Sequence, residues 1–191
     1  MQTERQAVTK SRNRKIVMQF SGLSDFVIGL RITSQTGGYS IHKKGEAKSL
    51  MKIAVRYQSR GGNTKAVAQA IAKAAGVTAE TIGVPLDGPA DLLFVGGGVY
   101  AWTIDRSLKD YLQTLNPDTV KSLAAFSTAG TMDGTGKIAA IAKERGIHVC
   151  EKTLPVKFGA KNHAWLGGKG TVELTDKQLQ LIDGFVREMI K

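Results

Sequence analysis

The sequence has a single cysteine, Cys150, among its 191 residues. One cysteine forms no internal disulfide and holds no cysteine-ligated iron–sulfur cluster, so both kinds of site are excluded. The three histidines are isolated, and no group of His, Cys and Asp has the spacing of metal ligands. No run of about 18 apolar residues occurs, so we expect no membrane-spanning helix. These absences favour a cytoplasmic protein without a metal site.

Positive charge is abundant but unevenly distributed. The chain has 27 basic and 16 acidic residues, a net charge of +11. Residues 1–50 hold nine basic and three acidic residues, a net charge of +6, and they show no helical or strand period. We interpret residues 1–50 as a basic, disordered N-terminal extension, or as sequence that precedes a natural start at Met51. Such a segment attracts nucleic acid or anionic lipid only weakly, so no specific nucleic-acid partner is expected.

From Met51 to Lys191, apolar segments of strand length alternate with helix-like segments. The alternation predicts one α/β domain at 51–191, a doubly wound sheet of five parallel strands with helices on both faces. The predicted strands are 52–57, 78–82, 91–98, 122–128 and 148–158, and the predicted helices are 64–75, 105–115, 137–146 and 176–190. The link from the second strand to the third is too short for a full helix, so that crossover helix is reduced or missing. In the first helix, Val67, Ile71 and Ala74 form the stripe expected to face the core.

The segment YQSRGGNTK joins the first predicted strand to the first predicted helix. Ligands of open parallel sheets bind at the carboxyl ends of strands, where a helix N-terminus offers free N–H groups and a partial positive charge. Ser59, Asn63 and Thr64 add side-chain donors. Gly61 and Gly62 let the backbone approach phosphate oxygens without a Cβ in the way. The segment therefore predicts a site for a phosphate monoester.

This loop resembles the FMN phosphate loop of the flavodoxin family, whose pattern is Ser/Thr-x-Thr-Gly-x-Thr. Ser59, Gly62, Asn63 and Thr64 match the pattern. Gly61 replaces the middle threonine, so one hydroxyl donor is lost. The resemblance covers nearly all of 51–191, and it implies non-covalent FMN and the flavodoxin-like strand order 2-1-3-4-5.

Arg60 is a second departure from the family pattern, since flavodoxins usually hold this phosphate without a cation. Two interpretations stay open for this residue. Arg60 either compensates for the lost hydroxyl at the phosphate or points into solvent.

The loop after the third strand, GGVYAW, carries two large aromatic side chains in a chain that is only 6% aromatic. Stacking of an aromatic pair contributes about 0.5–1.5 kcal/mol beyond the buried area. In flavodoxins this loop contacts the flavin through an aromatic ring and its backbone. The resemblance therefore implies that the cofactor is bound by Gly98, Val99, Tyr100, Ala101 and Trp102.

The loop after the fourth strand begins with STAG. By the same resemblance, Ser127, Thr128, Ala129 and Gly130 bind the pyrimidine edge of the flavin through backbone amides. Ser127 has no evident histidine and acid partners for nucleophilic catalysis, and we expect no catalytic side chain.

Two other nucleotide-binding motifs are incomplete. GGGVYA, residues 96–101, fits the dinucleotide pattern G-x-G-x-x-A, but no helix opens immediately after it. TMDGTGKI resembles the phosphate loop of NTPases, but Thr131 replaces its first glycine. Ile138 replaces the Ser/Thr that binds magnesium, so neither motif has the residues that its mechanism needs.

Taken together, the loops predict an FMN-binding protein that acts in electron transfer, with the protein tuning the flavin through hydrogen bonds and charge. Flavodoxins are typically acidic, whereas residues 51–191 carry a net charge of +5. We therefore expect a less negative reduction potential and an acidic redox partner protein. Two alternatives stay open: an FMN-dependent NAD(P)H or quinone-type reductase, and a flavin-free binding module with the same fold.

Overall fold

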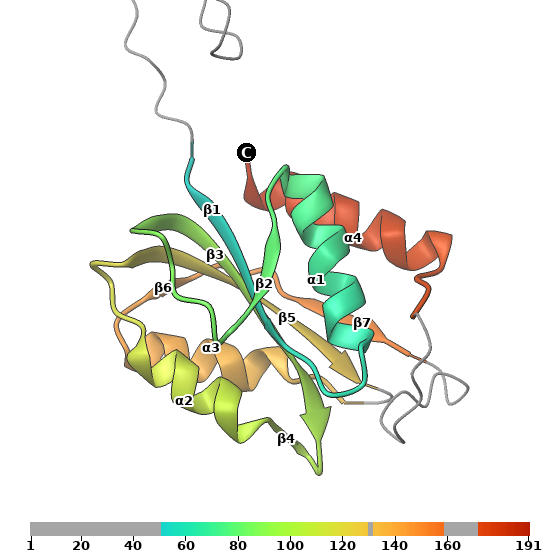
Figure 1. Ribbon diagram of the computed structural model, residues 1–191, viewed down its shortest axis with the longest axis horizontal. Helices are drawn as coiled ribbons and strands as arrows, with labels where there is room; N and C mark the ends of the chain where they lie inside the picture. Colours follow the sequence, from blue (N-terminus) through green and yellow to red (C-terminus); the bar gives the residue numbers. More distant parts are fainter. Residues whose placement is uncertain (1–50, 130–131, 159–171) are drawn as a thin grey trace, which may run out of the picture. The chain divides into compact units, whose positions relative to one another are not determined.

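The computed structural model describes residues 51–129, 132–158 and 172–191 (Figure 1). Two predictions concern residues outside these ranges: the disordered extension at 1–50 and the role of Gly130. The described residues form a mainly parallel sheet with helices on both faces. This arrangement confirms the predicted α/β class.

Five strands run parallel in the order β2-β1-β3-β5-β6. They are β2 (Ala79–Thr81), β1 (Ile53–Gln58), β3 (Ala90–Tyr100), β5 (Val120–Ala129) and β6 (His148–Val149). Numbered along the chain as parallel strands alone, this is the predicted order 2-1-3-4-5. The central strand β3 reads as a continuous apolar run because helices cover both of its faces.

The fifth predicted strand, 148–158, is not continuous. The structure divides it into β6 and β7 (Leu154–Lys157), and both pieces pair with β5. Between them, the charged side chains of Glu151 and Lys152 are exposed. Side chains of neighbouring residues in a continuous strand point to opposite faces of the sheet. In an unbroken strand, one of these two charged side chains would therefore point toward a face that helices cover. The chain instead leaves the sheet between the two strands.

The third strand is longer than predicted and does not end in a simple loop. It continues to Tyr100, and a short strand β4 (Thr103–Ile104) folds back along its end in antiparallel pairing. Only Ala101 and Trp102 form the turn between them. Residues 98–102, which were predicted as a loop, therefore form the end of a hairpin. The apolar residues of the strand continue to Val99, which pairs with the apolar Ile104 of β4.

Four helices flank the sheet: α1 (Asn63–Ala75), α2 (Arg106–Thr114), α3 (Thr135–Glu144) and α4 (Asp176–Met189). Figure 1 shows α1 and α4 on one face and α2 and α3 on the other. Each begins and ends within a few residues of its predicted bounds. Within the described ranges, no helix has both the length and the apolar character needed to cross a membrane.

The stripe predicted for α1 is partly wrong. Val67 and Ile71 are fully buried, but Ala74 is exposed. The buried face of α1 begins at Thr64 and continues through Ala68 along the helix, with its residues three or four positions apart. Ala74 lies at the edge of this face.

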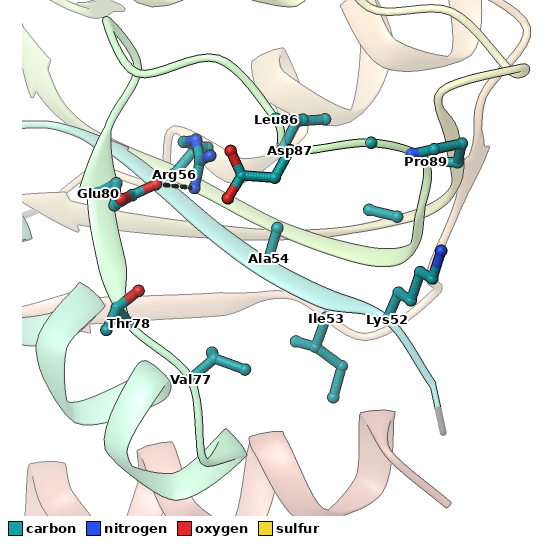
Figure 2. A pocket seen from close by; sticks show the side chains of 12 residues that line it. Lys52, Ile53, Ala54, Arg56, Val77, Thr78, Glu80, Leu86, Asp87 and Pro89 are labelled. Atoms are coloured by element: carbon teal, nitrogen blue, oxygen red, sulfur yellow. Dashed lines mark ion pairs between the residues drawn. The ribbon is translucent and has the colours of Figure 1, made fainter. Parts of the chain in front are cut away.

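The link from β2 to β3, residues 82–89, contains no helix, which agrees with the predicted loss of the second crossover helix. The buried Arg56 side chain fastens this link to the sheet. Its Nε donates to the Val84 carbonyl at 2.9 Å and its Nη2 to the Pro85 carbonyl at 2.6 Å. Figure 2 shows the ion pair of Arg56 with Glu80, which spans 2.9 Å, beside a hollow of about 250 Å³.

We predict that Arg56→Ala lowers the free energy of unfolding by about 2–3 kcal/mol, because it removes a buried cation and its hydrogen bonds. Urea unfolding of the full-length chain measures the loss. Arg187→Ala is the control, since Arg187 forms an exposed pair with Asp183 one helical turn away. That change costs no more than about 0.5 kcal/mol. Equal losses in the two variants would contradict a fastening role for Arg56.

Candidate functional site

The register of the sheet brings three loops together at the carboxyl ends of its strands. Gln58 at the end of β1 lies opposite Gly97 of β3. Gly98 of β3 lies opposite Thr128 near the end of β5. In an open parallel sheet this edge, beside the point where the strand order reverses, is the usual place for a ligand.

The first loop leads from β1 into α1 and leaves the helix without a side-chain cap. Gly62 precedes the helix at φ 94°, a conformation that favours glycine. Its N–H donates to Ser59 Oγ at 3.1 Å, which folds the loop over the helix end. The first turn of α1 contains no acidic residue. Uncapped N–H groups and the helix dipole make this end suitable for an anion.

Two buried amide oxygens near this loop have no hydrogen-bond partner among the described residues. They are Asn63 Oδ1, at the first position of α1, and Gln58 Oε1, at the end of β1. A buried polar atom without a partner costs about 1–3 kcal/mol. The oxygen and nitrogen of an amide exchange places when the group turns over, so each amide can present N–H donors instead. The pair therefore fits a ligand with several acceptor oxygens.

Thr64, which the sequence places among the phosphate donors, is engaged elsewhere. The residue is 1% exposed, and its Oγ1 lies 2.7 Å from Thr128 Oγ1. This buried hydrogen bond joins the start of α1 to the end of β5. The hydroxyl of Thr64 therefore connects two loops of the site, and Ser59 and Asn63 remain as side-chain donors of the first loop.

Arg60 neither points freely into solvent nor stays unpaired. Its Nε and Nη2 lie 2.8 and 2.6 Å from Asp105 Oδ2, and its guanidinium carbon lies 4.4 Å from the centre of the Tyr100 ring. The Arg60 N–H also donates to the Tyr100 hydroxyl at 3.2 Å. One residue of the first loop thus holds the second loop through an ion pair and a cation–π contact.

Asp105 was missed by the sequence analysis, although an aspartate directly before a helix is a common N-cap. Its Oδ1 accepts hydrogen bonds from the backbone N–H and the hydroxyl of Ser107, which caps α2. Burial acts to raise the pKa of the Asp105 carboxyl. The hydrogen bonds from Ser107 and Arg60 and the charge of Arg60 outweigh burial, so the pKa is lowered.

The glycines of the second loop are strand residues that allow other side chains to lie against β3. A Cβ at Gly98 would lie 2.7 Å from the Tyr100 hydroxyl, and one at Gly96 would lie 2.2 Å from the Phe126 ring. Tyr100 is half-buried, and burial raises the pKa of its phenol. Because β3 runs unbroken through these glycines, the segment is not the strand–turn–helix that a dinucleotide motif requires.

The turn between β3 and β4 is strained and exposed. Ala101 and Trp102 have φ values of 45° and 69°, each of which costs about 1–2 kcal/mol for a residue with a side chain. Lys137 Nζ donates to the Trp102 carbonyl at 2.6 Å and fastens the turn to α3. The Trp102 side chain is 75% exposed. The two aromatic residues therefore differ: Tyr100 is packed, whereas Trp102 projects from the surface.

The third loop is held by a hydrogen-bond network around Asp133, another residue that the sequence analysis missed. Ser127 is buried; its hydroxyl donates to Asp133 Oδ1 at 3.0 Å and accepts from the Gly134 N–H at 3.2 Å. The same carboxylate accepts from the N–H and hydroxyl of Thr135 at the start of α3. The Ser127 side chain therefore positions α3.

Val99 and Ala129, the remaining predicted residues in the described ranges, also lie at this edge. Val99 pairs with Ile104 in the β3–β4 hairpin. Ala129 ends β5, and its carbonyl accepts from the Phe158 N–H at 3.0 Å. The lysine of the NTPase-like segment is Lys137, which is bonded to the Trp102 carbonyl. The edge thus combines an uncapped helix, a packed tyrosine and a projecting tryptophan.

We predict that Asp105→Asn destabilises the chain by about 1 kcal/mol at neutral pH, because the amide still caps α2 but loses the ion pair with Arg60. The pKa of Asp105 lies below its ordinary value of 3.8, so its carboxylate stabilises the fold above that pH. This stabilisation is lost as the pH falls through the lowered pKa. Urea unfolding at a series of pH values should show the two proteins converging in acid. A gap that stays constant down to the acid end would contradict this assignment.

The chain is similar to a flavodoxin from the domain Archaea, with a TM-score of 0.58, 25% sequence identity and coverage of 73% of this chain and 96% of that one. It is also similar to oxidised Flavodoxin 2 from Bacillus cereus, with a TM-score of 0.54, 14% identity and coverage of 71% and 95%. A third match is the metal-soaked Flv1 flavodiiron core from Synechocystis sp. PCC6803, with a TM-score of 0.53 and 17% identity; it covers 75% of this chain and 36% of that one. No protein-family model and no curated protein matches the sequence.

Proposed function

We propose that this chain, which carries a flavodoxin-like domain, binds FMN non-covalently and transfers electrons. The observation that carries the proposal is the uncapped N-terminus of α1, beside which the buried Asn63 Oδ1 has no hydrogen-bond partner among the described residues. An FMN phosphate is a compact dianion that needs several donors converging on one point. The likeness to flavodoxins supports FMN as the source of that phosphate.

The first loop would hold the phosphate mainly through neutral donors. The hydroxyl of Ser59, the amide of Asn63 and the N–H groups at the start of α1 are available. Arg60 is paired with Asp105, so its charge would attract the phosphate from a distance and not through a direct hydrogen bond. Gly61 supplies no hydroxyl, which leaves Ser59 as the hydroxyl donor of this loop.

The second and third loops would position the flavin ring. Packing a ring against the exposed Trp102 would remove a large apolar surface from water, which supports the role predicted for this residue. Tyr100 is held by Arg60 and presents a fixed ring surface. The Ser127 and Thr128 hydroxyls are engaged within the protein, so the third loop would contribute backbone groups.

FMN, when bound, supplies the redox chemistry by accepting and releasing electrons at its ring. The chain's own residues bind, orient and tune the group. No side chain at this edge needs to act as an acid, a base or a nucleophile. Electron transfer therefore follows from binding and from the charges that surround the ring.

We predict that the purified full-length protein binds FMN and that Ser59→Ala weakens FMN binding by about tenfold, the effect of losing a hydrogen bond to a charged group. Riboflavin, which lacks the phosphate, should bind both proteins equally. Quenching of flavin fluorescence measures both affinities. Ser122→Ala is the control, because Ser122 lies near the opposite end of β5. An equal loss for riboflavin would show that Ser59 does not contact the phosphate.

The same preparation distinguishes the alternatives. Steady oxidation of NAD(P)H by the FMN-loaded protein would favour an FMN-dependent reductase. A colourless protein that leaves the fluorescence of added FMN unchanged would favour a flavin-free binding module and contradict the proposal. The absorption spectrum of the protein and the identity of any released flavin complete this test.

We predict that Arg60→Gln makes the reduction potential of bound FMN more negative, because reduction adds negative charge and the Asp105 carboxylate would then lack its counter-charge. Asp105→Asn should shift the potential in the opposite direction by removing that negative charge. Dye-equilibrated spectroscopic titration measures both shifts. If both variants shift the potential in the same direction, the effect comes from a moved loop and not from charge.

A further inference from the structure

Three helices carry charges that oppose their own dipoles. The first turns of α1, α2 and α3 contain no acidic residue. They contain four basic ones instead: Lys65 in α1, Arg106 and Lys109 in α2, and Lys137 in α3. A cation at a helix N-terminus is unfavourable, because that end already carries a partial positive charge. Carboxylates offset part of this cost at two of the helices, because Asp105 caps α2 and Asp133 accepts from the Thr135 N–H at the start of α3. The cations that remain together at one end of the molecule still point to a function for the charge.

The fourth helix shows the usual arrangement. Asp176 lies in the first turn of α4, and Thr175 and Gln178 form a reciprocal capping box. First turns with basic but no acidic residues are therefore not a general feature of the helices in the described part of the chain. They occur at the three helices that begin nearest the candidate flavin site, because each follows one of its three loops.

The acidic side chains near these cations are engaged with the protein itself. Asp105 binds Arg60 and Ser107, and Asp133 binds Ser127 and Thr135. Asp110 lies 3.9 Å from Arg106, but both side chains are largely exposed, so the pair is weak. Among the described residues, no carboxylate lies within ion-pair distance of Lys109 or Lys137. A net positive field therefore remains around this edge.

One cation contacts the turn of the projecting tryptophan, and another lies near it along the chain. Lys137 donates to the Trp102 carbonyl, and Arg106 begins α2 only four residues after Trp102. We define the basic rim as Arg106, Lys109 and Lys137 with the Trp102 turn. Lys65 is excluded from the rim because it lies in the first turn of α1, where the phosphate would bind.

We propose that the basic rim is the docking surface for an acidic electron-transfer protein, whose carboxylates contact the three cations while Trp102 lies at the centre of the contact. This proposal rests on the proposed function, since it places the partner at the edge of the flavin. Charge complementarity identifies the partner as acidic, and the face of the indole that the flavin would leave exposed supplies the apolar contact that protein interfaces favour. The rim is a short cluster of three cations rather than a long basic track, so it suits the carboxylates of a protein partner better than a phosphate backbone.

The first experiment titrates ¹⁵N-labelled full-length protein with a short poly-L-glutamate peptide as the acidic probe. Amide shifts should be largest at the Trp102 turn and the first turns of α2 and α3. Arg106→Gln combined with Lys109→Glu should weaken binding by roughly tenfold. The control combines Lys73→Gln with Lys143→Glu, which makes the same charge change in the last turns of α1 and α3. The control should leave the affinity within about twofold of the wild type.

Thermal unfolding of the same variants separates docking from folding. An acid in the first turn of α2 favours the helix dipole, so the rim variant should unfold at the wild-type temperature or above it. The control variant removes cations from helix C-termini and should unfold slightly lower. A rim variant that binds the peptide weakly and also unfolds early would overturn the proposal, because its loss would be structural.

The second experiment measures electron transfer from the chemically reduced FMN-loaded protein in a stopped-flow spectrometer. Ferricyanide is the anionic oxidant and tris(phenanthroline)cobalt(III) the cationic one. The rate with ferricyanide should fall roughly tenfold as salt is raised, and the rim variant should lose most of this dependence. The rate with the cobalt complex should change in the opposite direction. Equal salt dependence for the two oxidants would overturn the proposal.

The outcomes for the rim and for the flavin are separable. If the protein binds FMN but poly-L-glutamate shifts residues away from the rim, the docking surface is wrong and the proposed function stands. If the peptide binds at the rim and FMN does not bind, the surface stands and the electron-transfer function falls. A short duplex DNA that binds the rim more tightly than the peptide would overturn the proposal in favour of nucleic acid.

Discussion

The parallel register between β1, β3 and β5 is the constraint on which the rest of the site depends. It sets Gln58 beside Gly97 and Gly98 beside Thr128, so three loops far apart in the sequence open at one edge. The buried Thr64–Thr128 hydrogen bond then joins the first and third loops. Side chains of adjacent strand residues point to opposite faces of the sheet. A register shift of one residue would therefore turn the side chains of the shifted strand to the other face and break the contacts that they make at this edge.

Charge at this edge is arranged in two layers. The inner charges are engaged within the protein: Arg60 forms an ion pair with Asp105, and Asp133 accepts hydrogen bonds from neutral donors of β5 and α3. The outer charges, Lys109 and Lys137, stay at the surface near the starts of α2 and α3. The buried Asp105 carboxylate fixes the position of the exposed Arg60 side chain, whereas the outer cations act over a distance and are screened by salt.

The sequence predicted what local pattern determines. Alternating strands and helices predicted the parallel sheet and the missing crossover helix, because both follow from segment lengths and apolar runs, whereas the strand order was implied by the resemblance to flavodoxins. It did not predict the Arg60–Asp105 ion pair, which joins residues 45 positions apart, or the division of the fifth strand. These features depend on which side chains meet after folding, and a single sequence carries no direct signal of such contacts. Asp105 was the exception, since its N-cap position is a local signal.

Several unfavourable local energies occur together at this edge. An uncapped helix, a buried Asn63 Oδ1 without a partner among the described residues and two left-handed residues at 101–102 all occur there. By contrast, α4 begins with a complete capping box. Strain and unsatisfied groups persist only where the surrounding structure holds them in place, and they tend to cluster where a ligand or partner relieves them. The apolar strand β3, which is buried over most of its length and runs into this edge, supplies that rigid surrounding.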